Sequence, residues 1–234
     1  MTSRTEKRTI RAVIMDFDGL ILDTEGPAFQ SYQEIFEEYG GTLPLSAWAA
    51  WVGGSPHMFD PIRYLESQLG REVDREGLRQ RQREREGELI AAQSILPGVQ
   101  DYIADAKRLG LKLGLASSSD CGWVSRHLGR LGLSEHFDCI KCADDVKNVK
   151  PDPELYLAVL DELGLRPEEA LALEDSPNGI AAAQGAGIFC VVVPNPLTRQ
   201  LPTEHADLMF DSLAGLPLSE LLKQVEGKRG ASER

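Results

Sequence analysis

From about residue 95 onward, short apolar runs alternate with segments whose apolar residues have helical spacing. This alternation is typical of β-α-β units, in which a crossover helix joins each parallel strand to the next. Because such crossovers are right-handed, the units build one doubly wound sheet, and ligands of such sheets bind at the carboxyl ends of the strands. The expected strands cover residues 12–15, 111–116, 139–142, 170–173 and 189–193, and the expected helices cover residues 99–109, 121–131, 154–163 and 177–186.

Residues 25–93 interrupt this pattern. They favour helix, contain no convincing strand, and include the charged run 79–86, which is typical of a solvated helix face. The first strand therefore precedes a helical insertion. We expect a Rossmann-like α/β core formed by residues 1–24 and 94–234, with an inserted all-α helical cap of residues 25–93 above the end of the first strand. The polar C-terminal residues 226–234 are expected to fray.

The composition restricts the partners. The formal net charge of −12 argues against nucleic acid or an anionic membrane, because both select a basic surface. No apolar run has the length of a membrane span, and the polar, basic N-terminus is not followed by the apolar stretch of a signal sequence. The four cysteines have no spacing typical of a disulfide framework, which favours a reduced, cytoplasmic setting.

Cys139 and Cys142 form a Cys-x-x-Cys motif within an expected strand. In extended backbone this spacing places the two sulfur atoms on opposite faces. No second Cys or His pair with metal-ligand spacing follows, so we do not expect zinc or redox chemistry there.

The first expected strand is followed by Asp16-Phe17-Asp18-Gly19. Carboxylates two residues apart in extended backbone point the same way, which is unfavourable unless positive charge lies beside them. A hard cation such as Mg²⁺ fits, because it prefers oxygen ligands, and Gly19 allows a sharp turn or a close approach to a ligand. The alternative is an acidic turn that closes an ordinary strand.

A cluster of hydroxyl groups, Ser117, Ser118 and Ser119, follows the strand at 111–116 and is itself followed by Asp120 and a helix. Backbone N–H groups at a helix start, together with serine hydroxyls, form a site for an anion. The same residues could equally serve as a plain N-cap, with Ser119 or Asp120 in that role.

Two further strand ends carry charged residues. Lys150 lies in a loop that Pro151 and Pro153 stiffen just before a helix, where it could act as an electrostatic clamp, although a single lysine is usually solvated. Glu174 and Asp175 follow the fourth expected strand as another carboxylate pair, for which the alternative is a polar helix start.

These motifs occur in the order Asp-x-Asp, Ser, Lys and Glu-Asp, all at carboxyl ends of parallel strands. In this order and spacing the chain resembles the haloacid dehalogenase (HAD) superfamily, in the branch with a helical cap inserted after the first strand. Its Asp-Gly-x-x-x-Asp-Thr-Glu, Ala-Ser-x-Ser, Lys-Pro-Asp-Pro and Glu-Asp-Ser segments are similar to those of beta-phosphoglucomutase-like proteins. The resemblance covers residues from about 10 to 220.

The resemblance implies a role for each motif. It makes Asp16 the nucleophile that forms an aspartyl-phosphate, and Asp18 the general acid that protonates the leaving alcohol and then activates water. It assigns phosphate binding to Ser117, to the backbone N–H of Ser118 and to Lys150. The lysine would also offset charge that builds in the transition state.

The resemblance also implies a Mg²⁺ ion as cofactor. It assigns the ion to Asp16, the backbone carbonyl of Asp18 and Asp175, with Glu174 as an outer or auxiliary ligand. The expected function is therefore a Mg²⁺-dependent phosphatase that hydrolyses a small phosphate ester, such as a sugar phosphate.

Four alternatives can be compared within this resemblance. Dehalogenases of this superfamily lack an aspartate at the position of Asp18, so dehalogenation is disfavoured. Phosphonate cleavage requires a lysine from the cap, and residues 25–93 contain none, so this activity is excluded. A beta-phosphoglucomutase carries a histidine and an arginine where Ala28 and Pro56 stand here, which favours hydrolysis over the mutase reaction. A catalytically silent binding protein would show damage to the motifs, and none is seen.

The substrate is not fixed by these motifs. Cap residues that could contact it are Arg63, His57 and the arginines within 79–85, most of which we expect to be solvated. Trp48 and Trp51 are expected to hold cap helices together rather than to bind substrate. Thr24 and Glu25 begin the linker into the cap as structural or hinge residues, the glycine-rich loop at 52–56 could approach the site, and a monomer is the expected state.

Overall fold

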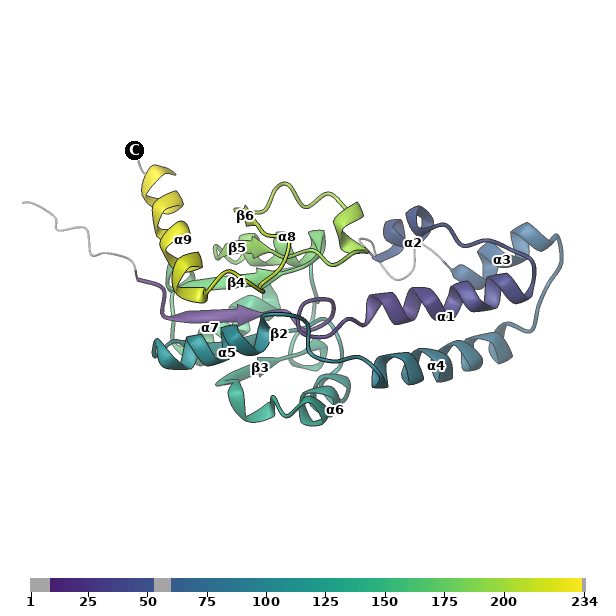
Figure 1. Ribbon diagram of the computed structural model, residues 1–234, viewed down its shortest axis with the longest axis horizontal. Helices are drawn as coiled ribbons and strands as arrows, with labels where there is room; N and C mark the ends of the chain where they lie inside the picture. The colour runs from purple at the N-terminus through teal and green to yellow at the C-terminus, as the bar shows by residue number, and fades with distance from the viewer. Residues whose placement is uncertain (1–8, 53–59, 233–234) are drawn as a thin grey trace, which may run out of the picture.

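The computed structural model describes residues 9–52 and 60–232 (Figure 1). Six parallel strands form one sheet in the order β3-β2-β1-β4-β5-β6. The expected α/β, Rossmann-like fold class is confirmed, and the first strand lies in the interior of the sheet. The strands are β1 (Ala12–Met15), β2 (Lys112–Ala116), β3 (Cys139–Lys141), β4 (Ala170–Glu174), β5 (Phe189–Val192) and β6 (Leu208–Met209).

Strand β1 is buried on both faces, which explains its uninterrupted apolar sequence. Val13 and Met15 pack into the cluster formed with α5 (Val99–Arg108), α6 (Cys121–Leu131) and α9 (Leu218–Ser232). Ala12 and Ile14 face the other way, toward α7 (Glu154–Leu163) and α8 (Pro177–Gly185). Complete burial of each large apolar side chain contributes about 1.5–3 kcal/mol, so this two-sided core holds the strand ends in place.

Capping residues fix where the helices begin and end near the carboxyl edge of the sheet. The Asp120 carboxylate accepts a hydrogen bond from the backbone of α6, and the Ser176 hydroxyl accepts one from the backbone of α8. Gly132 and Gly164 end α6 and α7 in the left-handed conformation, directly after the expected helix ends at residues 131 and 163. Four short 3₁₀ turns complete the described connections: η1 (Ser134–His136), η2 (Ala143–Asp145), η3 (Pro167–Glu169) and η4 (Thr198–Gln200).

The insertion between β1 and α5 consists of helices that extend away from the sheet in Figure 1. Within its described residues it contains no strand, and its apolar residues form a cluster separate from the two faces of the sheet. Leu197, from the loop after β5, packs into this cluster and so joins it to the sheet. The helices are α1 (Glu25–Glu38), α2 (Leu45–Val52), α3 (Pro61–Leu69) and α4 (Arg75–Ala91), with α1 and α4 side by side.

The two segments that connect the insertion to the sheet run next to each other. Leu22 and Ile95 form an antiparallel bridge, and the Leu96 N–H donates to the Ile21 carbonyl at 2.9 Å. Entry to the insertion and exit from it therefore lie beside the end of β1.

Two elements differ from the sequence prediction. The short strand β6 was not predicted, and residues 226–232 do not fray, because they continue α9. Leu218, Leu221 and Val225 are fully buried at spacings of three and four residues, and this apolar stripe anchors the helix to the sheet. No helix in the described part of the chain combines the length and apolar character needed to cross a bilayer.

Candidate functional site

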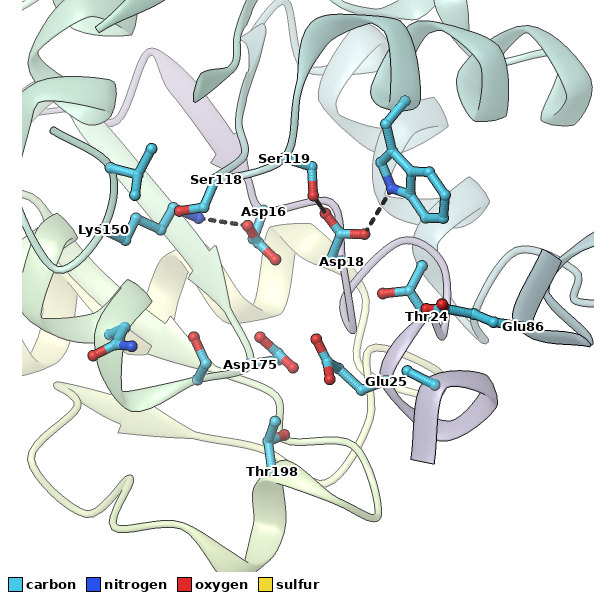
Figure 2. Close-up of a pocket in the computed structure, with 15 residues that line it drawn as sticks. Asp16, Asp18, Thr24, Glu25, Glu86, Ser118, Ser119, Lys150, Asp175 and Thr198 are labelled. Atoms are coloured by element: carbon cyan, nitrogen blue, oxygen red, sulfur yellow. Dashed lines mark hydrogen bonds and ion pairs between the residues drawn. The ribbon is translucent and has the colours of Figure 1, made fainter. Parts of the chain in front are cut away.

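A cavity of about 410 Å³ opens at the carboxyl end of the sheet, between the strand ends and the helical insertion (Figure 2). Side chains from the strand ends and the loops after them line one part of it: Asp16, Asp18, Ser118, Ser119, Lys150 and Asp175. Residues of the insertion and the linker into it line another: Thr24, Glu25, Ala28 and Glu86. The sequence motifs from four strand ends thus meet at one place.

Three carboxylates crowd the base of this cavity. Asp16, Glu174 and Asp175 each offer an oxygen atom within 4.8 Å of the others, and all three residues are buried. The Lys150 ammonium donates to Asp16 Oδ1 and, at 2.6 Å, to Glu174 Oε1. Tyr156 donates its hydroxyl to the same Glu174 oxygen at 2.5 Å. The cluster therefore holds three acidic groups against one cation.

This imbalance perturbs the acid–base properties of the cluster. Burial raises the pKa of Asp16 to about 8, against the opposing charge of Lys150, and the charges of Glu174 and Asp18 add to the rise. Burial and the charge of Asp16 raise the pKa of Asp175 well above its ordinary value. Although burial alone would lower the pKa of Lys150, the two carboxylates that it binds raise it.

The donor set fits a divalent cation. Carboxylate oxygens are the ligands that Mg²⁺ prefers, and a bound cation would relieve the repulsion that raises these pKa values. Glu174 is the least available member, because Lys150 and Tyr156 bind one of its oxygens and the backbone N–H of Asp175 donates to the other at 3.2 Å. Asp16 and Asp175 line the cavity, whereas Glu174 lies behind it.

Asn195 binds the Asp175 carboxylate, and Gly19 leaves space for it. Asn195 donates from Nδ2 to Asp175 Oδ2 at 2.9 Å, and its own Oδ1 accepts from the backbone N–H groups of Leu197 and Thr198 at 2.9 Å each. Gly19 has a φ of +86°, and a Cβ there would lie 2.2 Å from Asp175 Oδ2. The close approach expected at Gly19 is therefore to a carboxylate of the cluster itself.

Gly179 on α8 makes room for Glu174 in the same way. A Cβ at this position would lie 1.9 Å from Glu174 Oε2. The buried carboxylate therefore occupies the space that any larger residue would fill.

The Asp18 carboxylate is turned away from Asp16 and bound by three donors, two of which Figure 2 draws as dashed lines. Ser117 and Ser119 donate their hydroxyls to Oδ2 at 3.1 Å and 2.7 Å, and the Trp123 indole N–H donates to Oδ1 at 3.1 Å. Ser117 Oγ also accepts the Ser119 N–H at 3.0 Å. Three donors from the end of β2 and from α6 therefore hold this carboxylate in place.

The expected site residues are therefore close together, in the cavity wall or directly behind it. Ser117 and Glu174 lie behind the wall, and the others line it. Sequence reasoning missed Trp123, Tyr156 and Asn195, which contact these residues from α6, α7 and the loop after β5. In the sequence, Trp123 follows the serine cluster, Tyr156 follows Lys150 and Asn195 follows β5, each within a few residues. This proximity does not by itself distinguish a site residue from an ordinary core or loop residue.

The expected cap residues are distributed differently. Arg63 and the described arginines of α4 do not line the cavity, and Trp48 is fully buried in the insertion's core, as predicted. Ala28 does line the cavity. His57 and residues 53–56 lie outside the described residues, as does the side chain of Trp51.

The cysteines belong to two faces of the sheet. Cys139 packs on the α7 side and Cys142 on the α6 side, which confirms the prediction that they point in opposite directions. Cys142 instead lies near Cys121 and Asp145. Burial raises the pKa values of the thiols of both Cys121 and Cys142.

A doubly wound parallel sheet with this acidic cluster, lysine and inserted helices defines a recognised class of hydrolases. Residues 13–193 match the family of haloacid dehalogenase-like hydrolases, and the chain belongs to that family. It is an enzyme of this family, and several of its relatives are named as phosphatases.

Individual relatives are similar over most of their length. YhcW of Bacillus subtilis, a candidate phosphatase by name, is 48% identical over 94% of this chain and 99% of its own. A phosphorylated carbohydrates phosphatase of Thermotoga maritima is 33% identical over 76% of this chain and 82% of its own. The crystal structure of a CbbY variant from Rhodobacter sphaeroides with xylulose-1,5-bisphosphate has a TM-score of 0.70 and 29% identity, covering 91% of this chain and 99% of that one.

Proposed function

We propose that this protein is a Mg²⁺-dependent phosphatase that hydrolyses a small phosphate ester, in the class of sugar phosphates, through an aspartyl-phosphate on Asp16. The observation that carries the proposal is the buried group of Asp16, Lys150 and Asp175 at the base of a cavity of substrate size. The names of relatives that act on phosphorylated compounds support the same reaction class.

The reaction has two displacements at phosphorus. A carboxylate oxygen of Asp16 attacks the phosphorus atom, the bond to the leaving oxygen breaks, and Asp18 donates a proton to that oxygen to release an alcohol. Asp18 then takes a proton from water, whose oxygen attacks phosphorus and displaces Asp16 to release phosphate. To reach the leaving oxygen, Asp18 Oδ2 must leave its hydrogen bonds with Ser117 and Ser119.

Three residues would bind the transferred group. Lys150 lines the cavity beside Asp16, so its ammonium can contact both the nucleophile and a phosphoryl oxygen. The Ser118 backbone N–H would donate to a phosphoryl oxygen, and so would the Ser117 hydroxyl once it is released from Asp18 Oδ2. Removing one such preorganised donor costs on the order of 10²–10³ in rate.

Asp16, Asp175 and the backbone carbonyl of Asp18 would hold Mg²⁺, with Glu174 as an auxiliary group that anchors Lys150. When bound, the ion neutralises charge on the phosphoryl group and allows an anionic nucleophile to approach it.

The division into domains belongs to the same proposal. We assign residues 1–24 and 94–234 to a catalytic core and residues 25–93 to a cap that closes over the cavity, with Thr24 and Glu25 at the hinge. The separate apolar cluster of the insertion and the paired linkers at Leu22 and Ile95 support this division. We further propose that the protein is cytoplasmic and monomeric. Light scattering on the purified protein tests the monomeric state.

The experiment is phosphate release from a panel of sugar phosphates and an aryl phosphate, with and without Mg²⁺. We expect Mg²⁺-dependent turnover, and a loss of at least about 10³-fold in Asp16→Asn. Asp101→Asn, an exposed aspartate on α5, is the matched control and should keep full activity. Turnover that persists in Asp16→Asn, or no turnover of any ester, would refute the proposal.

A mutase remains the second candidate, because the structural neighbours include a beta-phosphoglucomutase from Clostridium difficile. Ala28, which lines the cavity, has no group that could take part in transferring a proton or holding a sugar. We therefore expect free phosphate rather than an isomerised sugar phosphate from each substrate, which product analysis distinguishes.

A further inference from the structure

The part of the cavity formed by the insertion carries two carboxylates, Glu25 at the start of α1 and Glu86 on α4. Figure 2 shows both across the cavity from Lys150. The Glu25 carboxylate makes no hydrogen bond or ion pair with another described residue, and the Glu86 carboxylate accepts one hydrogen bond, from Gln82 Nε2 at 2.9 Å. Thr24 Oγ1, which also lines the cavity, is buried without a hydrogen-bond partner among described residues. These oxygens therefore have capacity left for hydrogen-bond donors of a substrate.

Positive charge in the described cavity wall is confined to the other end. Lys150 is the one basic residue among the described lining residues, and Asp16 and Glu174 already bind its ammonium. Its remaining capacity is needed for the phosphoryl group that is transferred.

The arginines of α4 do not change this balance, although all five lie on the same helix as Glu86. Each forms an ion pair with an acidic residue of the insertion, and none lines the cavity. The pairs are Arg75 with Glu66 at 2.6 Å, Arg79 with Asp60 at 2.8 Å, Arg81 with Glu38 at 2.7 Å, Arg83 with Glu76 at 3.4 Å and Arg85 with Glu34 at 2.8 Å.

Carboxylates favour one kind of leaving group and disfavour another. A carboxylate accepts hydrogen bonds from hydroxyl groups, and two carboxylates can bind neighbouring hydroxyls of a polyol. A second phosphate or a carboxylate on the substrate would instead meet like charge above about pH 7, because burial raises the pKa of Glu25 to about 7, and the described wall has no free cation to offset it.

We propose that the leaving group is an uncharged polyol whose hydroxyls donate to Glu25 and Glu86, so that the enzyme selects monophosphates and rejects substrates with a second anionic group. The inference rests on the proposed phosphatase function and deepens it. It also separates this chain from the CbbY variant, whose crystal structure holds a bisphosphate.

A matched pair of substrates tests the proposal. Glucitol 6-phosphate and 6-phosphogluconate share a carbon skeleton and differ in whether the far end is a hydroxymethyl group or a carboxylate. At about pH 8, where Glu25 is mostly ionised, we expect kcat/KM of the natural protein to be at least about tenfold higher for glucitol 6-phosphate than for 6-phosphogluconate. A ratio near one, or a preference for 6-phosphogluconate, would overturn the proposal.

Two variants assign the selectivity to the carboxylates. Glu25→Gln and Glu86→Gln keep the size of the side chain and remove its charge, so each should shrink the ratio by about threefold or more, mainly through tighter binding of 6-phosphogluconate. Glu84→Gln on the same helix is the matched control, because Glu84 is exposed and does not line the cavity. A ratio that both variants leave unchanged would contradict the proposed role of the two carboxylates.

An aryl phosphate assayed in parallel separates the two levels of failure. Mg²⁺-dependent hydrolysis of all three esters without discrimination would overturn this inference and leave the phosphatase proposal intact. No hydrolysis of any ester would overturn both.

Discussion

Gly179→Ala is expected to destabilise the protein, although alanine is the better helix former. Gly179 lies within α8, where replacing glycine by alanine would by itself stabilise the helix by about 1 kcal/mol. The added Cβ, however, would lie 1.9 Å from Glu174 Oε2, whereas ordinary contacts begin near 3.4 Å. Either the carboxylate or the helix must move by about 1.5 Å to relieve the overlap.

The carboxylate cannot move without losing its partners. Glu174 is completely buried and accepts hydrogen bonds from Lys150 at 2.6 Å and Tyr156 at 2.5 Å. Hydrogen bonds to a charged group contribute about 1.5–3 kcal/mol each, so losing both costs about 3–6 kcal/mol. After the helix propensity is subtracted, we expect the free energy of unfolding to fall by about 2–5 kcal/mol.

Gly185→Ala on the same helix is the matched control. A Cβ at Gly185 would meet Pro153 Cβ at 3.5 Å, which is an ordinary contact. We therefore expect this variant to be neutral or more stable by up to about 1 kcal/mol. The assay is denaturant unfolding of both variants in the presence of a chelator, with the slope m compared to confirm that only stability changes.

A double-mutant cycle isolates the cause. In a Glu174→Ala background the overlap is absent, so Gly179→Ala should lose most of its cost. Equal stability changes for Gly179→Ala and Gly185→Ala, or an undiminished cost in the Glu174→Ala background, would refute the reasoning.

Three further changes test other parts of the site. Lys150→Met leaves buried carboxylates without their cation, so in chelator it should lower the free energy of unfolding by about 3–5 kcal/mol. Lys147→Met in the same loop should change this free energy by less than about 0.5 kcal/mol. Similar unfolding midpoints for the two variants would contradict this prediction. Trp123→Phe removes the indole N–H that holds Asp18 and should lower kcat about tenfold with KM little changed, so an unchanged kcat counts against a positioning role. Burial and nearby carboxylates raise the pKa of Glu25 from 4.5 to about 7, so the folded state holds this proton more tightly and loses stability as pH rises through that window. Between about pH 5 and pH 8 the natural protein should therefore lose up to about 3 kcal/mol more than Glu25→Gln, measured by denaturant unfolding in chelator, and an equal loss would be the contrary result.

Asp16 and Asp175 could be found in the sequence because each follows an apolar strand, and Lys150 because prolines stiffen its loop before a helix. The rule that carboxyl ends of parallel strands meet at one edge brings them together, and the resemblance to the HAD superfamily gave each its expected role. Local patterns also predicted where α6 and α7 end, since glycine at a left-handed cap has a physical cause within a few residues.

Other elements gave too weak a local signal. Strand β6 has two residues, and α9 has only a narrow apolar stripe within a polar sequence. Its burial depends on the surface offered by α5 and the sheet, which no window of the sequence contains. Likewise, Leu197 lies far from the cap in sequence and yet completes its apolar core.

By itself, the sequence determined the alternating core, the helical insertion and the order of acidic, hydroxyl and basic groups, because these follow from periodicity and from residues at strand ends. Only the tertiary structure decided what surrounds those groups. It brought Tyr156 and Gly179 to Glu174, Trp123 to Asp18, and an unpaired Glu25 into the cavity. The physical reason is that burial and charge at a point depend on every segment packed there, and these segments are far apart along the chain.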